Sequence, residues 1–108
     1  MAQADIDTLN IINNFIGEAR KTLSSDKVVL FGSRASGRQS QWSDIDIIVA
    51  SDDFIGIDFI QRLTTLGKIA WQAKATEIEA LGFTSNEYDS ASELDFLWQI
   101  KQNGKVVA

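Results

Sequence analysis

Two aspartates separated by one residue, Asp44 and Asp46, stand at the start of an apolar run that continues to residue 50. If this run is a β-strand, residues two apart point to the same face of the sheet, so the two carboxylates stand side by side. Ionised carboxylates at such a short separation repel each other. A divalent cation, or a pair of cations, removes that repulsion. The alternative is a solvated entrance to an ordinary strand, so the aspartate pair alone does not define a site.

A glycine and a serine, Gly32 and Ser33, follow another short apolar run at residues 27–31. A glycine directly after a buried strand lets the backbone turn sharply and approach a ligand. Free backbone amides and a hydroxyl at such a turn form a cradle for phosphate, and Arg34 and Arg38 would add positive charge beside it. An ordinary turn between a strand and a helix explains the same residues. A Walker A loop is excluded, because no Gly-Lys-Ser/Thr follows at the required spacing.

A third carboxylate is expected from the alternating segment at residues 75–81, where Glu77 and Glu79 share one face of a predicted strand. We choose Glu79, since it lies nearer the end of that strand, although a pair of exposed glutamates explains the segment equally well. Together, the glycine turn would hold a polyphosphate and the acidic side chains would hold Mg²⁺ ions that bridge the phosphates. The third carboxylate would orient or deprotonate an attacking hydroxyl. This combination predicts a phosphoryl-type transfer, in which positioning and charge neutralisation carry most of the catalysis.

The composition limits the metals and partners of such a site. The chain has 108 residues, a net charge of −5, and neither histidine nor cysteine. A metal must therefore be held by oxygens, which favours Mg²⁺, Mn²⁺ or Ca²⁺. The acidic charge and the lack of a basic stripe argue against direct binding to nucleic acid. No apolar window reaches 18 residues and no signal segment is recognisable, so we expect a cytoplasmic protein without a membrane span.

The elements that must position these residues follow from the hydrophobic periodicity. The pattern predicts helices at residues 5–23, 56–71 and 91–102, and strands at 27–31, 45–50 and 75–81. Two capping boxes are expected, one at Thr84 and Glu87 and one at Ser92 and Asp95. A helical turn at 35–37 and a loop at 38–43 separate the glycine turn from the aspartates. The order predicts a single α/β (α+β) domain over residues 1–108, with a small mixed sheet flanked by helices.

The segment LFGSRASGRQSQWSDIDIIV resembles a known signature. Gly32 and Ser33, ten residues, and then Asp44-Ile45-Asp46 match the GSx10DxD pattern of the nucleotidyltransferase superfamily related to DNA polymerase β, and in particular its minimal nucleotidyltransferases. The resemblance is specific over residues 27–50 and extends less firmly through IEALGFTSNEY. It implies that Asp44, Asp46 and Glu79 are catalytic metal ligands. It also implies that Gly32 and Ser33 bind the triphosphate of ATP or another NTP.

The resemblance also implies a reaction and a partner. An acceptor hydroxyl would attack the α-phosphate of the NTP and release pyrophosphate, with Arg34, Arg38 and Ser43 as further candidates for nucleotide binding. Minimal members often act as antitoxins to a HEPN-domain toxin, and some transfer AMP to a tyrosine of that toxin. Larger relatives carry an acceptor domain, so we expect another polypeptide to complete the site here. The sequence departs from the family at Glu79, where aspartate is more usual, which leaves catalytic competence open.

The aromatic residues are expected to have mainly structural roles. Trp42 is expected to cover the sheet edge rather than stack on a base, and Trp71 and Trp98 to belong to the core or to an interface. Tyr88 is expected in a surface turn, although it is a conceivable acceptor of a nucleotidyl group. The apolar side formed by Leu94, Leu97 and Trp98 favours contact with a partner.

Two further functions stay open beside the enzyme. One is a catalytically inactive module that binds NTP or metal and neutralises its partner by contact, and the other is a purely structural α/β domain. The oligomeric state is open as well, and a homo-oligomer is a further possibility.

Overall fold

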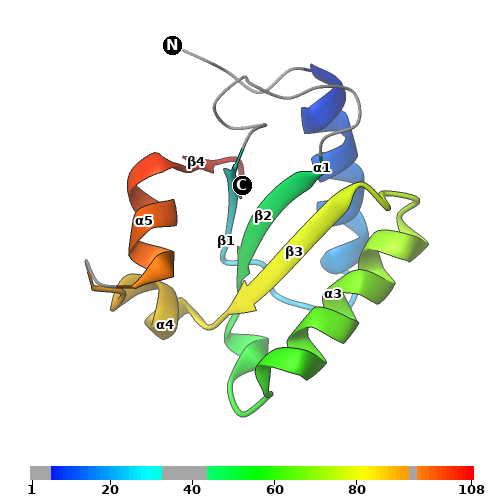
Figure 1. Cartoon of the computed structure of the whole chain (residues 1–108). Helices are drawn as coiled ribbons and strands as arrows, with labels where there is room; N and C mark the ends of the chain where they lie inside the picture. The colour runs from blue at the N-terminus through cyan, green and yellow to red at the C-terminus, as the bar shows by residue number, and fades with distance from the viewer. Residues whose placement is uncertain (1–5, 33–43, 93–94) are drawn as a thin grey trace.

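The computed structural model describes residues 6–32, 44–92 and 95–108. It forms two layers of helices around one four-stranded sheet (Figure 1). The helices are α1 (Ile6–Ala19), α3 (Phe59–Gln72), α4 (Ser85–Asp89) and α5 (Phe96–Asn103), with a short 3-10 helix, η1 (Asp52–Phe54). The strands are β1 (Lys27–Phe31), β2 (Ile45–Ala50), β3 (Ile78–Phe83) and β4 (Lys105–Val106).

The sheet is mixed and has the order β3-β2-β1-β4. Strand β1 pairs antiparallel with both β2 and β4, whereas β2 and β3 run parallel and are connected through η1 and α3. The register places Phe31 opposite Asp46, and Asp46 opposite Glu79. The predicted α/β fold with a small mixed sheet is therefore confirmed.

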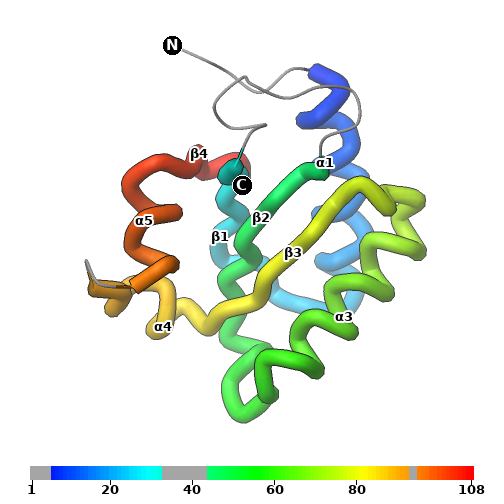
Figure 2. Tube along the Cα trace, in the orientation of Figure 1, coloured from blue at the N-terminus to red at the C-terminus, as the bar shows by residue number. Residues whose placement is uncertain are grey.

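The two faces of the sheet bury different apolar clusters. Helices α1 and α3 cover one face, as the tube in Figure 2 also shows, and α4 and α5 lie on the other side. The strands alternate between these faces, because successive side chains of a strand point in opposite directions. On the first face Leu30, Ile47 and Leu66 are completely buried, and on the second face Val29, Ile48 and Leu97 form a smaller core. The acidic residues of β2 and β3 share the second face.

Several element boundaries differ from the sequence prediction. Helix α1 ends at Ala19, because the backbone N–H groups of Lys21 and Thr22 donate to carbonyls three residues back and form tight turns instead. Strand β3 begins at Ile78 rather than at residue 75: the N–H of Ile78 donates to the carbonyl of Ala75, which closes a turn there. The prediction also missed η1, α4 and β4.

One of the two predicted capping boxes is confirmed. The Thr84 hydroxyl accepts from the N–H of Glu87, and the Glu87 carboxylate accepts from the N–H of Thr84, which opens α4. The second prediction, at Ser92 and Asp95, is wrong as a helix start. The Ser92 N–H does donate to the Asp95 carboxylate, at 2.8 Å, but Asp95 is the N-cap residue of α5, which begins at Phe96 instead of residue 91, and its side chain makes no capping hydrogen bond to the helix. The predicted stop at Asn103 and Gly104 is confirmed.

A buried arginine, Arg62, joins four segments at the end of the sheet away from the acidic residues. Its guanidinium donates to the carbonyls of Ile57 (2.7 Å), Phe54 (3.0 Å) and Gly82 (3.3 Å). It also donates to Oε1 of Glu87, at 2.6 Å. These acceptors lie in η1, in the turn before α3, in β3 and in α4, so one side chain fixes their relative positions. Within the described ranges, no helix is long and apolar enough to cross a membrane.

Candidate functional site

Three of the predicted acidic residues come together at one end of the sheet. Asp46 lies in β2 with Glu79 as its neighbour in β3, and Asp44 directly precedes β2. The side chains of all three lie on the face that α4 and α5 partly cover, because residues two apart in a strand share a face. Ile45, between the aspartates, is completely buried on the opposite face. The alternation predicted from the sequence is therefore present.

The charges of these carboxylates affect one another. Burial, followed by the negative charge of Asp44, raises the pKa of Asp46 above its ordinary value, although hydrogen bonding with Glu79 opposes this shift. The negative charge of Asp44 is the main cause that raises the pKa of Glu79, with burial, Asp46 and hydrogen bonding to both aspartates adding to it. The folded chain therefore disfavours the ionised forms of Asp46 and Glu79, as expected for carboxylates that lie close together without a bound cation.

Removing one of these charges should stabilise the metal-free protein. A carboxyl whose pKa is raised on folding adds stability below its unfolded pKa and loses it as the pH rises through the folded pKa. At pH 7 the wild type lacks the stability that an uncharged side chain at position 79 would give. Glu79→Gln removes the charge, so we expect it to raise Tm by about 2–4 °C, a small effect because Glu79 is exposed. The gain should disappear below about pH 4, as thermal unfolding in a chelator can show. An equal gain from Glu77→Gln would contradict this account.

The glycine turn lies directly beside Asp46. Gly32 follows β1 with a φ of +76°, a left-handed conformation that favours glycine. A Cβ atom at this position would lie 2.5 Å from Oδ2 of Asp46, so only glycine lets the carboxylate rest against the backbone. The structure thus brings Gly32 to the acidic residues. Ser33, Arg34, Arg38 and Ser43 lie outside the described residues, as do Trp42 and the helical turn expected at 35–37.

The donor set suits a hard divalent cation, although the present geometry is not that of a finished metal site. Within residues 6–32, 44–92 and 95–108, no group of three or more acidic side chains is arranged to hold a metal ion. The three carboxylates nevertheless offer only oxygen atoms, the ligands that Mg²⁺ prefers, and they repel one another without a cation. The chemistry of the residues therefore fits Mg²⁺.

Glu77, the alternative third carboxylate, takes a different position. It precedes β3, and its backbone carbonyl accepts a hydrogen bond of 2.8 Å from the N–H of Ile45. Its side chain is exposed, and the carboxylates that raise the pKa of Glu79 are those of Asp44 and Asp46. The choice of Glu79 over Glu77 as a metal ligand stays a prediction, but the arrangement favours it.

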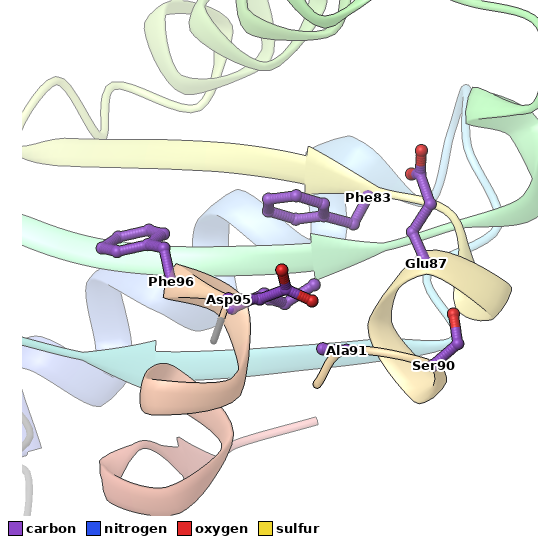
Figure 3. Close-up of a pocket in the computed structure, with 7 residues that line it drawn as sticks. Phe83, Glu87, Ser90, Ala91, Asp95 and Phe96 are labelled. Atoms are coloured by element: carbon purple, nitrogen blue, oxygen red, sulfur yellow. The ribbon is translucent and has the colours of Figure 1, made fainter. Parts of the chain in front are cut away.

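A pocket of about 370 Å³ opens on the same face as the acidic residues (Figure 3). Phe83 of β3 and Phe96 of α5 stand on two sides of it, and Glu87, Ser90 and Asp95 supply polar atoms. Phe96 also contacts Phe31 edge to face, with ring centroids 6.3 Å apart. Phe31 is the register neighbour of Asp46, so Phe96 extends one side of the pocket toward the acidic residues, whereas Phe83 and Glu87 lie toward the opposite end of the sheet. The sequence analysis missed these two phenylalanines, which lie far apart in the chain and carry no motif.

The predictions for the other aromatic residues had mixed outcomes. Tyr88 is buried in α4, with the ammonium groups of Lys27 and Lys101 each 5.1 Å from its ring centre. The expected surface turn is therefore wrong. Trp71 is 73% exposed and does not belong to the core, while Trp98 is half-buried. On the apolar side of α5, Leu97 is buried and Leu94 lies outside the described residues.

The fold and the acidic sheet end define a nucleotidyltransferase-like α/β protein, and comparison with known proteins agrees. The chain matches the model of the family described as polymerase beta, nucleotidyltransferase, over residues 10–108. It therefore belongs to this family, and the prediction that it is a nucleotidyltransferase is confirmed at that level.

Two solved structures resemble the chain. A "putative nucleotidyltransferase" from Sulfolobus solfataricus has a TM-score of 0.65 and 16% identity, and the match covers 98% of this chain and 87% of that one. At this identity the likeness shows the fold alone. A chain from a toxin–antitoxin crystal structure with AMP-PNP has a TM-score of 0.60 and 26% identity, over 89% of this chain and 71% of that one. No curated protein matches the chain.

Proposed function

We propose that this protein transfers a nucleoside monophosphate, most simply AMP from ATP, to a hydroxyl group of a partner protein. The observation that carries the proposal is the convergence of three carboxylates, one just before β2, one in β2 and one in β3, beside the left-handed glycine turn. Membership in the nucleotidyltransferase family supports the reaction type. The likeness to a toxin–antitoxin structure with AMP-PNP supports both the choice of nucleotide and a role as one component of a toxin–antitoxin pair.

Each residue would have a defined role. Asp44, Asp46 and Glu79 would hold Mg²⁺, which when bound neutralises the charge of the phosphates and of the pyrophosphate that leaves. Gly32 would let the backbone approach the triphosphate, with Ser33, Arg34, Arg38 and Ser43 as the predicted remainder of the phosphate site. The three carboxylates repel the negative charges of a nucleotide. Mg²⁺ is therefore required before an anionic nucleotide can bind next to them.

The chemical step exchanges a phosphoanhydride bond of the nucleotide for a phosphate ester bond to the acceptor. The acceptor oxygen forms a bond to the α-phosphorus, while the bond between that phosphorus and the oxygen bridging to the β-phosphate breaks. The electron pair of the broken bond leaves with pyrophosphate, and the acceptor's proton passes to a carboxylate of the site or to water. The family resemblance suggests a HEPN-domain protein as the acceptor, and a gene for such a protein next to this one would support the pairing.

The decisive experiment follows the α-phosphate of labelled ATP. The purified protein is mixed with the product of the neighbouring gene in Mg²⁺, and label on that partner is measured with and without EDTA. Transfer that requires the metal supports the enzyme. Tight complex formation without any transfer would contradict it and favour the inactive binding module. That alternative is compatible with Glu79, because aspartate is more usual at this position in the family.

Substitution of the glycine turn should impair both stability and activity. We expect Gly32→Ala to cost about 1–2 kcal/mol of unfolding free energy, because alanine disfavours a φ of +76°. The new Cβ would also displace the Asp46 carboxylate, so transfer should fall by about 10²-fold or more. Denaturant unfolding and the labelling assay measure the two effects.

A second glycine provides a matched control. Gly56 has a φ of +78°, and a Cβ atom there would meet nothing within 4 Å. Gly56→Ala should therefore cause a similar loss of stability while transfer stays near the wild-type rate. If both variants lost activity alike, backbone strain would explain the result and contact with Asp46 would not.

A further inference from the structure

Strand β3 forms an open edge of the sheet (Figure 1), and it carries Glu79, the register neighbour of Asp46. The N–H of Ile45 donates to the carbonyl of Glu77, and the N–H of Ser51 donates to that of Phe83. Odd-numbered residues of β3 therefore turn their backbone groups toward β2, and even-numbered residues turn theirs outward. In the described part of the chain, the N–H and the C=O of Ala80 have no hydrogen-bond partner. Only one charged side chain, Glu79, protects this edge against pairing with another strand.

A groove of about 300 Å³ runs along the same edge, between β3 and α3. Leu63 and Gly67 of α3 form one side of it, and Ile78 and Ala80 belong to the other. A Cβ atom at Gly67 would meet nothing within 4 Å, so the groove is open at this point. Glu79 also lines the groove, so the groove reaches the residue of β3 whose side chain belongs to the acidic group on the other face of the sheet.

We infer that this edge binds the acceptor: an extended segment of the partner protein pairs with β3, presents a hydroxyl side chain beside Glu79, and inserts an adjacent apolar side chain into the groove. The inference rests on the proposed transfer reaction and specifies the acceptor as a strand-forming segment. Addition of a strand to an open sheet edge is a common mode of peptide recognition, in which main-chain hydrogen bonds give affinity and alternate side chains give specificity.

The register of the sheet explains why such a segment would place its hydroxyl correctly. Phe31, Asp46 and Glu79 form one row across three strands, with their side chains on the same face. An added strand lies about 4.8 Å beyond β3 and continues this row. The residue opposite Glu79 then points to the acidic face, and its two chain neighbours point to the groove beside Leu63 and Gly67. The expected acceptor is therefore a serine, threonine or tyrosine flanked by apolar residues.

The test measures nucleotide binding and transfer on the same protein samples. Binding is followed as the rise in Tm when Mg²⁺ and AMP-PNP are added. Transfer is followed as label from α-labelled ATP on synthetic decapeptides with a central Ser, Thr or Tyr and Leu or Val on both sides. A peptide pool with central Ala gives the background, and a pool with Asp at the flanking positions tests the groove.

Two pairs of variants separate the edge from the fold. The N–H of Ala80 points away from β2, so Ala80→Pro removes this N–H without removing a bond to β2, and proline is tolerated at such edge positions. Ala80→Ser keeps that N–H. Gly67→Phe fills the groove, and Gly67→Ala leaves it open. We expect Ala80→Pro and Gly67→Phe to lower peptide labelling at least tenfold, whereas Ala80→Ser and Gly67→Ala stay within about twofold of the wild type. The rise in Tm with Mg²⁺ and AMP-PNP should be the same in all five proteins.

Each outcome decides between the possibilities. Labelling of the apolar-flanked peptides that both Ala80→Pro and Gly67→Phe reduce supports the inference. The inference is overturned, while the proposed function stands, if these variants do not change the labelling. It is also overturned if the wild type binds Mg²⁺ and AMP-PNP but labels no peptide above the central-Ala pool. A wild type without any rise in Tm overturns the proposed function and this inference together.

Discussion

Asp46→Asn is expected to abolish nucleotidyl transfer, lowering kcat/KM by at least about 10³-fold while the fold is retained. Asp46 is the central member of the acidic group: it lies between Phe31 and Glu79 in the sheet and rests against Gly32. An amide at this position keeps the size of the side chain but removes the charge that would bind Mg²⁺. Transfer of label from α-labelled ATP to the partner, over a range of Mg²⁺ concentrations, measures the loss.

The matched control for this prediction is Glu77→Gln, which removes one negative charge two residues before Glu79. Because Glu77 precedes β3 and is exposed, we expect transfer to stay within about threefold of the wild type. Retention of full activity by Asp46→Asn would disprove a metal-binding role for this residue. Equal losses in both variants would indicate a general effect of net charge instead of a specific site.

The same variant separates the enzyme from an inactive antitoxin. If the protein neutralises its partner by covalent modification, Asp46→Asn should still form the complex but should no longer neutralise the partner. If it neutralises the partner by contact, the variant should be as effective as the wild type. Binding and neutralisation must therefore be measured on the same preparations.

The acidic site was predictable because its geometry follows from local rules. A period of two places Asp44 and Asp46 on one face, and it places Glu77 and Glu79 on one face as well. The rule does not choose between the two glutamates, and Glu79 is preferred only because it lies nearer the end of its segment. The parallel pairing of β2 with β3, which makes Asp46 and Glu79 neighbours, is a tertiary property. The sequence suggested that pairing only through the family resemblance. The Gly32 turn was predictable for the same local reason, since only glycine adopts its conformation easily.

The mistakes arose where distant segments decide the structure. Tyr88 has the local surroundings of a surface residue, but Lys27 from β1 and Lys101 from α5 cover its ring. Ser92 and Asp95 have the spacing of a capping box, and their hydrogen bond forms a turn before the helix instead of its first turn. The open edge of β3 also depends on the strand order, which no periodicity reveals.

Arg62 shows the same limit most clearly, and its removal should have the largest effect on stability. Three of the four acceptors of its guanidinium are backbone carbonyls, which any sequence supplies, so no pattern marks this residue. We expect Arg62→Met to lower the free energy of unfolding by about 3–5 kcal/mol, because it leaves these carbonyls and the Glu87 carboxylate without their donor. Tm should fall by more than about 10 °C in thermal unfolding. A loss below about 1 kcal/mol would contradict this role.

Glu87→Gln separates the ion pair from the hydrogen bonds. Burial raises the pKa of the Glu87 carboxyl, but its hydrogen bond with Arg62, its bonds with Thr84 and the positive charge of Arg62 together lower it below its ordinary value. Such a group adds stability above its unfolded pKa and loses it as the pH falls through the folded pKa. The glutamine keeps an acceptor oxygen, so the variant should lose less than about 1 kcal/mol at pH 7. The difference from wild type should begin to shrink below about pH 4 and should vanish only when the pH lies below the lowered pKa of Glu87 in the folded protein. A loss as large as that of Arg62→Met would mean that the charge of Glu87, rather than the backbone carbonyls, is what Arg62 stabilises.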